Sequence, residues 1–325
     1  MRFRCFALVS AAAAVVTFAA LAPVAAQQKT APPLTAWGAP DLQGVWDFRS
    51  LTPLERPSGL KDKDVFSSGE EAETFAQETI KRQSRDSDTS GRVVPYNDFW
   101  FDEGTKVTTT RTSLIVDPPD GRMPPMTPAG EKKRAAEREA RNKNGADLPP
   151  PGGWVTDLNP TIRCIVGFNS GPPMRPSAYN NNMHLIQTRD YVAIVTEMVH
   201  DARIVPLDKR PHLSQSVRQW MGDSRGRWEG QTLVVETTNF RPDRTPFGGS
   251  ASTRLTERFS RADVSTLMYE VTVDDPTTWT KPWTFRVPMA YSKEPMYEYA
   301  CHEGNYGLYN ILSGVGKERN SPKSK

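Results

Sequence analysis

The sequence predicts a mainly β protein, an antiparallel up-and-down barrel or barrel-like sandwich with an N-terminal arm and one or two peripheral helices. Between residues 161 and 315, short segments rich in β-branched and aromatic residues recur, each bounded by Gly, Pro, Asp or Asn. No segment with helical periodicity interrupts the series. Parallel strands need such a crossover, so the strands are expected to pair antiparallel. About 300 residues remain after an N-terminal signal, enough for one large β domain.

The first 26 residues have the features of a signal peptide. Arg2 and Arg4 form a basic start, an alanine-rich apolar run extends to Leu21, and residues 24–26 supply the small side chains of a cleavage site. An N-terminal membrane anchor is the alternative, because the run approaches spanning length. Cleavage predicts a periplasmic or secreted protein without stable membrane insertion, and residues 27–40, rich in Pro, Ala and Gln, predict a linker.

Residues 41–160 predict an arm with the first strands and a surface helix. "GVW" at residues 44–46 begins the first strand, and a serine cap followed by acidic residues predicts a helix over residues 67–81. A second helix is predicted over residues 128–143, solvated because it carries almost no apolar side chain. Residues 111–122 predict a strand ending in a turn. The proline-rich segment 117–128 is expected outside the sheet, because proline lacks the backbone donor of a ladder.

The antiparallel β region is predicted over residues 161–315, followed by a disordered tail at 316–325. Its strands are expected in "YVAIVTEMV", "TLVVETTNF", "TRLTERFSR", "TLMYEVTVD" and "WTFRVPM". The intervening "MGDSRGRWEG", residues 221–230, predicts a tight turn. Isolated acids in these strands, Glu236, Glu257 and Glu270, are expected to face solvent or to pair with arginine or lysine from a neighbouring strand.

Two of the three cysteines remain after signal cleavage, Cys164 and Cys301. In an oxidising compartment such a pair predicts one structural disulfide. The alternative is a Cys301 nucleophile served by His302, but adjacent residues of a strand point to opposite faces, so the disulfide is favoured.

Charge and motifs exclude several classes of function. The formal net charge is +3, or about +1 without Arg2 and Arg4, and the sequence has no basic stripe or nucleic-acid motif, so a nucleic-acid partner is excluded. No zinc-binding spacing, G-x-S-x-G or dinucleotide fingerprint occurs, so neither metal nor cofactor is predicted. A metal site assembled from histidines of separate strands remains an alternative, because such a site leaves no spacing signature.

The strongest candidate site lies in "TEMVHDARIVPLD", residues 196–208. A strand from Tyr191 to His200 would have two mostly apolar faces, yet ionisable residues crowd its end. The predicted catalytic residues are Glu197, His200 and Asp201, joined by His302 and Glu303 from the C-terminal segment. A histidine partnered by a carboxylate titrates near neutral pH, which suits general acid–base catalysis. The alternative is a set of ions that compensate one another.

Substrate contacts are predicted in three places. "YNNNMH" offers an aromatic ring and amides for a sugar or phenolic ligand, Arg203 offers a cation for an anionic group, and two tryptophans offer stacking surfaces. The residues are Tyr179, Asn180, Asn182, His184, Arg203, Trp220 and Trp228. In the alternative, the asparagines form a turn and the tryptophans fill the barrel.

Two resemblances accompany these patterns. The Gly-x-Trp of residues 44–46 resembles the opening of lipocalin-like (calycin) barrels. The block from "YNNNMHLIQT" to "YEYACHEGNYGL", covering most of residues 179–310, is similar to a group of uncharacterised secreted bacterial proteins. The second resemblance implies export and a shared β architecture.

The leading hypothesis is a secreted or periplasmic hydrolase or lyase that acts on a carbohydrate or aromatic small molecule by general acid–base catalysis. The alternatives are a non-catalytic calycin-like carrier of a small hydrophobic ligand and an envelope structural protein. An apolar lumen would favour the carrier, and convergent ionisable groups would favour the enzyme.

Overall fold

The computed structural model describes residues 33–86, 97–144 and 154–320, so the predicted signal peptide and most of the linker lie outside the described residues. The α-helices are α1 (Gly69–Gln83), α2 (Pro128–Asn144) and α3 (Tyr306–Asn320). The strands are β1 (Gly44–Asp47), β2 (Ile115–Asp117), β3 (Asn182–Gln187), β4 (Tyr191–Thr196), β5 (Ala202–Pro206), β6 (Asp223–Glu229), β7 (Thr232–Thr238), β8 (Arg254–Arg261), β9 (Thr266–Asp274) and β10 (Trp283–Ser292).

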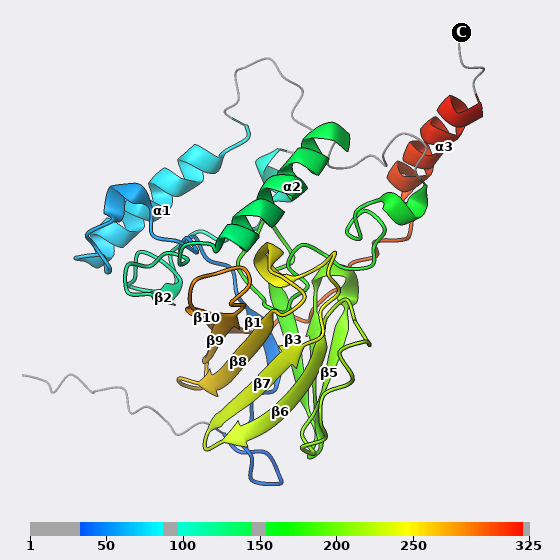
Figure 1. Ribbon diagram of the computed structural model, residues 1–325. Helices are drawn as coiled ribbons and strands as arrows, with labels where there is room; N and C mark the ends of the chain where they lie inside the picture. Colours follow the sequence, from blue (N-terminus) through cyan, green and yellow to red (C-terminus); the bar gives the residue numbers. More distant parts are fainter. Residues whose placement is uncertain (1–32, 87–96, 145–153, 321–325) are drawn as a thin grey trace, which may run out of the picture. The chain divides into compact units, whose positions relative to one another are not determined.

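The described strands form one antiparallel sheet, which confirms the predicted fold class (Figure 1). Nine of them follow the order β5-β4-β3-β1-β10-β9-β8-β7-β6, and the short β2 pairs with β10 beside this path. Every pairing along the path is antiparallel, and the path has an odd number of strands. The two edge strands, β5 and β6, therefore run in the same direction. They contact each other without forming a ladder, so the sheet is barrel-like but open at this seam.

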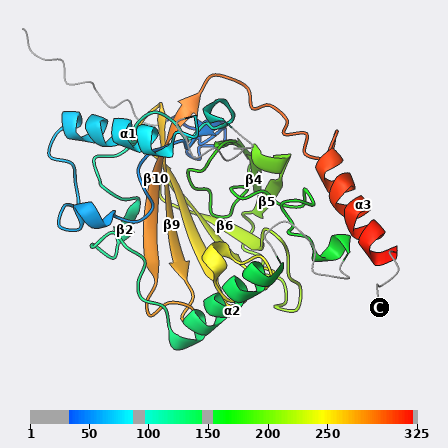
Figure 2. The ribbon, with the colours of Figure 1, turned by 90° about the horizontal axis from the view of Figure 1, so that it is seen from above.

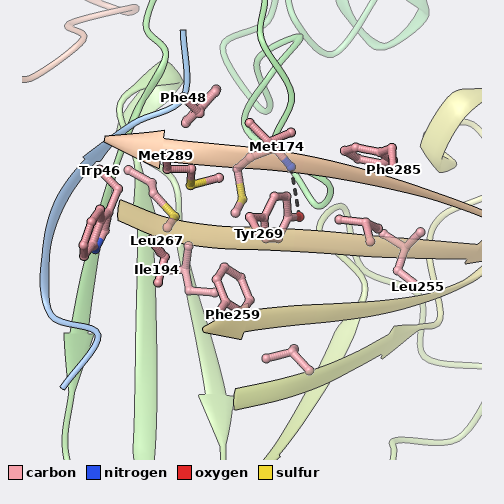
Figure 3. Packing of buried hydrophobic residues seen from close by; sticks show 14 of the residues in the cluster. Trp46, Phe48, Met174, Ile194, Leu255, Phe259, Leu267, Tyr269, Phe285 and Met289 are labelled. Carbon is pink, nitrogen blue, oxygen red and sulfur yellow. Dashed lines mark hydrogen bonds between the residues drawn. The ribbon is translucent and has the colours of Figure 1, made fainter. Parts of the chain in front are cut away.

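Alternation along the strands builds the core. In β9, Leu267, Tyr269, Val271 and Val273 are buried, while the residues between them are partly exposed. Figure 3 shows Trp46, Phe259, Tyr269 and Phe285 projecting from separate strands into one buried cluster. These side chains pack against one another at the positions that would line a carrier's lumen. The interior is therefore a packed core with one polar group of residues within it.

Two predicted helices are confirmed. Ser68 caps α1 by accepting a hydrogen bond from the Glu71 backbone N–H at 3.2 Å, as the sequence signal indicates. Helix α2 is largely exposed and lies across the end of the strands (Figure 2). Its Gly130 lies against Thr278, where a Cβ would come within 2.5 Å of the backbone oxygen. Of the segment 117–128, predicted outside the sheet, residues 118–127 lie outside the ladders apart from an isolated bridge between Met126 and Trp279. The prediction is wrong at Asp117, which ends β2 and pairs with Thr284.

Three further sequence predictions are wrong. Residues 223–229 form strand β6 rather than a tight turn, paired with β7 along their whole length. Strand β4 ends at Thr196 rather than His200, and the chain turns before β5 begins. Helix α3 replaces the end of the predicted β region and the start of the predicted disordered tail. The helix has a normal N-cap, because the Asn305 side chain accepts a hydrogen bond from the Leu308 N–H at 3.1 Å. Glycines inside the helix weaken the helical signal in the sequence.

Cys164 and Cys301 form the predicted disulfide, at a sequence separation of 137. The bond fixes the segment after β10 against residues 159–165. Next to it, the His200 Nδ1 lies 3.1 Å from the Tyr299 carbonyl oxygen. The disulfide and this contact together bring the C-terminal segment to the β4–β5 turn.

Candidate functional site

A cleft of about 620 Å³ lies along the seam between β5 and β6. One side is formed by residues 201–204 and the other by residues 218–225, which include Trp220, Arg218 and Arg225. Because β5 and β6 run in the same direction, the residues that begin them lie at the same end of the cleft. These residues are Asp201, directly before β5, and Asp223, the first residue of β6. The open seam thus brings together two carboxyl groups that are 22 residues apart in sequence.

At the other end of the cleft, Gly226 allows β5 and β6 to lie close together. A Cβ at Gly226 of β6 would lie 2.6 Å from the Leu207 Cδ2 and 2.9 Å from the Val205 Cγ1. Only a residue without a side chain allows β5 and β6 to approach this closely. The cleft is therefore bounded by Gly226 and opens toward the aspartates.

Inside the barrel, the seam is bridged by side chains rather than by backbone hydrogen bonds. Arg203 projects inward from β5 and binds Glu257 of β8 through both guanidinium nitrogens, with Nη2 donating to Oε1 at 2.9 Å. The Tyr269 hydroxyl donates to the same carboxylate at 2.7 Å and accepts from the Met174 N–H at 3.2 Å (Figure 3). Ser224 of β6 lies 3.5 Å from the arginine. The group connects β5 to β6, β8 and β9.

This buried group fixes the role of Arg203. Burial alone would lower its pKa, but the charge and hydrogen bonds of Glu257, with the charges of Tyr269 and Asp201, together more than offset this, so the pKa of the guanidinium is raised. Burial and the same carboxylate raise the pKa of Tyr269 well above its ordinary value. The predicted assignment of Arg203 to a substrate anion, or to a carboxylate of the 196–208 cluster, is therefore wrong. Its planar fork binds the fully buried Glu257.

Asp201 has the opposite environment. It is partly buried in the cleft wall, and burial raises the pKa of its carboxyl, although the Ala202 N–H and the charges of His200 and Arg203 act against the increase. The two residues before the aspartate have left-handed backbones, with φ of 63° at Val199 and 43° at His200. Such conformations are unfavourable for a β-branched residue, and they occur preferentially at functional sites.

A histidine that was not predicted as a site residue, His212, contacts Asp223 of the cleft wall. His212 Nδ1 lies 2.8 Å from the Asp223 Oδ2, and Asp223 also accepts from the Leu213 N–H at 3.0 Å and from Arg225 at 2.6 Å. With Nδ1 facing the carboxylate, the Nε2 of the ring is directed away from it. No local motif could identify the pair, because His212 precedes β6 and meets Asp223 only through the fold.

The other predicted site residues lie apart from the cleft lining. Glu197 accepts from the Asn182 side chain at 2.9 Å, and His200 is exposed beside Tyr299. His302 and Glu303 are exposed after the disulfide, and His184 and Trp228 are partly buried within β3 and β6. The Tyr179 ring packs on Phe168, and Asn180 adopts a left-handed turn conformation. Of the predicted set, the cleft is lined by Asp201, Arg203 and Trp220.

The strand acids outside the core are paired as the sequence predicts. Glu270 accepts from Arg286 of the adjacent strand at 3.0 Å, and Glu236 accepts from Arg227 at 2.8 Å. Across residues 33–86, 97–144 and 154–320, no group of three or more His, Cys, Asp or Glu is arranged to hold a metal ion, and no helix is long and apolar enough to span a bilayer.

No protein-family model, curated protein or solved structure matches the chain.

Proposed function

We propose that the chain is an exported enzyme of the hydrolase or lyase type, periplasmic or secreted, that performs general acid–base catalysis on a small molecule bound in the β5–β6 cleft. One observation carries the proposal. Asp201 and Asp223 lie at the same end of one cleft, and their surroundings differ, since Asp223 accepts hydrogen bonds from an arginine, a histidine and a backbone N–H. Two carboxyl groups in contrasting environments are typical of an acid and its matching base.

The roles follow from these environments. Burial favours the protonated form of Asp201, so this residue is the general acid. Asp223 orients the His212 ring through Nδ1, so the imidazole is the general base, acting through Nε2. Trp220 supplies an aromatic surface in the same cleft, which suits a sugar or aromatic ring.

Two observations favour an enzyme over a carrier. The inward positions of the barrel are filled by packed side chains and by the Arg203–Glu257 pair, whereas a carrier of a hydrophobic ligand needs an apolar lumen. The cleft itself is lined by ionisable residues. The disulfide supports export, because such bonds persist in oxidising compartments.

The test uses residues 27–325 with a panel of 4-nitrophenyl glycosides and esters and with a uronate polymer, in which lyase action forms an absorbing double bond. For a substrate that the wild-type protein converts, we expect Asp201→Asn to lower kcat by about 10²- to 10⁴-fold and to remove the basic limb of the pH–rate profile, because the general acid is lost. We expect Asp223→Asn to lower kcat as well, because the His212 ring loses the carboxylate that orients it. Asp274→Asn, at the end of β9 and outside the cleft lining, is the matched control and should retain full turnover. Full turnover by Asp201→Asn, or no conversion of any panel member by the wild-type protein, contradicts the proposal.

A further inference from the structure

A second pocket lies beside the cleft and shares Trp220 with it. Its volume is about 220 Å³, and its walls come from the segments 168–175 and 240–248. A cavity of about 150 Å³ is enough to hold benzene. The pocket therefore has room for one ring and a small substituent.

Two arginines line this pocket without a carboxylate between them. Arg244 donates to the Gly167 carbonyl oxygen at 2.6 Å, and Arg175 has no hydrogen-bond or ion-pair partner within the described part of the chain. Burial lowers the pKa of Arg175, and burial together with the charge of Arg175 lowers the pKa of Arg244. Arg175 as a whole residue is exposed to solvent, yet the protein that surrounds its guanidinium removes part of the hydration of that group. Two partly desolvated cations that repel each other are costly unless an anion joins them.

Three acids close to these arginines in the fold or in sequence are already paired. Glu103, which lines a separate pocket with Arg175, lies 3.8 Å from Arg85. Glu137 of α2 lies beside Gly248 at the edge of the pocket, where it binds Lys133. Asp243 is bound by Arg241 at 2.9 Å. None of the residues that line the pocket is acidic. No acid of the pocket lining therefore neutralises the positive charge of Arg175 and Arg244.

Four aromatic residues also line the pocket: Phe168, Trp220, Phe240 and Phe247. Phe247 has a left-handed backbone, with φ of 54°, and its ring is fixed edge-on against Trp283 with centroids 4.8 Å apart. The Arg175 guanidinium carbon lies 6.0 Å from the centroid of the same ring. The arginine and the aromatic surface thus face one shared space.

We propose that this pocket binds a small aromatic oxyanion, with the carboxylate or phosphate held between Arg175 and Arg244 and the ring against Phe168 and Phe247. Arginine presents a planar fork that matches both oxyanions, and aromatic side chains stack on a flat apolar ring. The pocket can act as a binding site whether or not the neighbouring cleft is catalytic, so this inference does not depend on the proposed enzyme activity. Because Trp220 lines both the pocket and the cleft, the two spaces are adjacent, and one molecule could occupy parts of both.

The experiment measures binding by isothermal titration calorimetry at low ionic strength with four probes: benzoate, phenyl phosphate, inorganic phosphate and benzyl alcohol. The first two separate carboxylate from phosphate, the third lacks the ring and the fourth lacks the charge. We expect at least one aryl anion to bind more tightly than both partial probes, and to bind more weakly as salt is added. Arg175→Gln should weaken that binding by about 10- to 100-fold, the range expected for the loss of a charged hydrogen bond. Arg175→Gln/Arg244→Gln should abolish it.

Arg258→Gln is the matched control, because Arg258 is an exposed arginine of β8 that binds Glu229 at 2.9 Å away from the pocket. It should bind the aryl anion like the wild-type protein. Near-UV circular dichroism checks that each variant keeps its packed core. The proposal is overturned if neither aryl anion binds, if benzyl alcohol or inorganic phosphate binds as tightly as its aryl anion, or if the folded double variant retains wild-type affinity.

Discussion

Two regions of the molecule hold buried or partly buried arginines that differ in whether a carboxylate binds them. Arg203 has such a partner, whereas Arg175 and Arg244 have none within the described part of the chain. Arg203 is buried in the barrel and bound through both nitrogens to Glu257, with Tyr269 adding a third hydrogen bond. Arg175 and Arg244 are partly desolvated in a surface pocket and have no carboxylate partner. A buried charge whose partner lies within the fold holds strands in place. A partly buried charge without one is available to a ligand.

Along the open seam between β5 and β6, the residues that stabilise the barrel are also different from those that line the cleft. Interior side chains connect β5 to β6 and β8, so the outer edges of β5 and β6 need not pair by backbone hydrogen bonds. That leaves a cleft in which Asp201 and Asp223 face a common space. The buried pair stabilises the barrel, and the unpaired edges leave room for a site.

The largest expected effect comes from removing one partner of the buried pair. Glu257→Gln leaves the Arg203 charge in the interior without its counter-ion and should lower the free energy of unfolding by about 3–5 kcal/mol. The measurement is equilibrium unfolding in urea.

Glu270→Gln is the matched control, because Glu270 pairs with Arg286 on the solvent side of the neighbouring strand. It should cost no more than about 1 kcal/mol. Equal effects of the two substitutions would show that the Arg203–Glu257 pair does not hold the seam.

A second variant acts on the seam itself. Gly226→Val places a branched side chain where Leu207 and Val205 leave no room, and overpacking of this kind should lower the free energy of unfolding by about 1–3 kcal/mol. Hydrogen exchange should become faster in β5 and β6. Gly59→Val, at a position where no atom lies within 4 Å of an added Cβ, is the control. A Gly226→Val protein with wild-type stability and exchange would mean that close approach at Gly226 is not required.

The pH dependence of stability distinguishes Asp201, whose carboxyl pKa is raised by burial, from a carboxylate that is stabilised by a cationic side chain. Burial raises the pKa of Asp201 above its ordinary 3.8, so the folded state holds this proton more tightly than the unfolded state. The contribution of Asp201 to stability is then fully present below pH 3.8 and is lost as the pH rises through the folded-state pKa. At neutral pH, Asp201→Asn should therefore be at least as stable as the wild-type protein, and this advantage should disappear in acid.

Thermal unfolding curves of both proteins from about pH 3 to pH 7 test this dependence, across the range in which a carboxyl with a raised pKa titrates. Asp274→Asn shows the effect of losing a carboxylate elsewhere in the sheet. An Asp201→Asn protein that loses stability specifically at neutral pH would mean that the ionised carboxylate has a stabilising partner.

The smallest effect is expected at the pocket arginines. Arg175→Gln removes a charge that has no internal partner, so the free energy of unfolding without ligand should stay within about 0.5 kcal/mol of wild type or rise slightly. Urea unfolding in ligand-free, low-salt buffer measures it. A loss comparable to that of Glu257→Gln would assign Arg175 a structural role and remove the contrast between the two regions.

Much of the fold could be predicted from local patterns. The period of two in β8 to β10, the Ser68 cap of α1 and the Pro128 start of α2 are local signals, because neighbouring residues in sequence determine them. The disulfide was predicted because two cysteines leave one pairing. Strand β6 was missed because its Gly, Asp, Ser and Arg are typical of a turn, and only pairing with β7 makes it a strand.

The candidate site depended far more on the tertiary structure. The sequence placed Asp201 and Arg203 in one polar cluster, but Arg203 binds a buried carboxylate 54 residues away. His212 and Asp223 meet across a loop without any spacing signature. In sequence, Arg175 and Arg244 resemble ordinary surface arginines. They are distinguished only in the folded structure, where no carboxylate of the pocket lining binds them. Local sequence determines which segments become strands and helices, whereas the partners of a charge, and the absence of a partner, are set by long-range packing that no short stretch of sequence records.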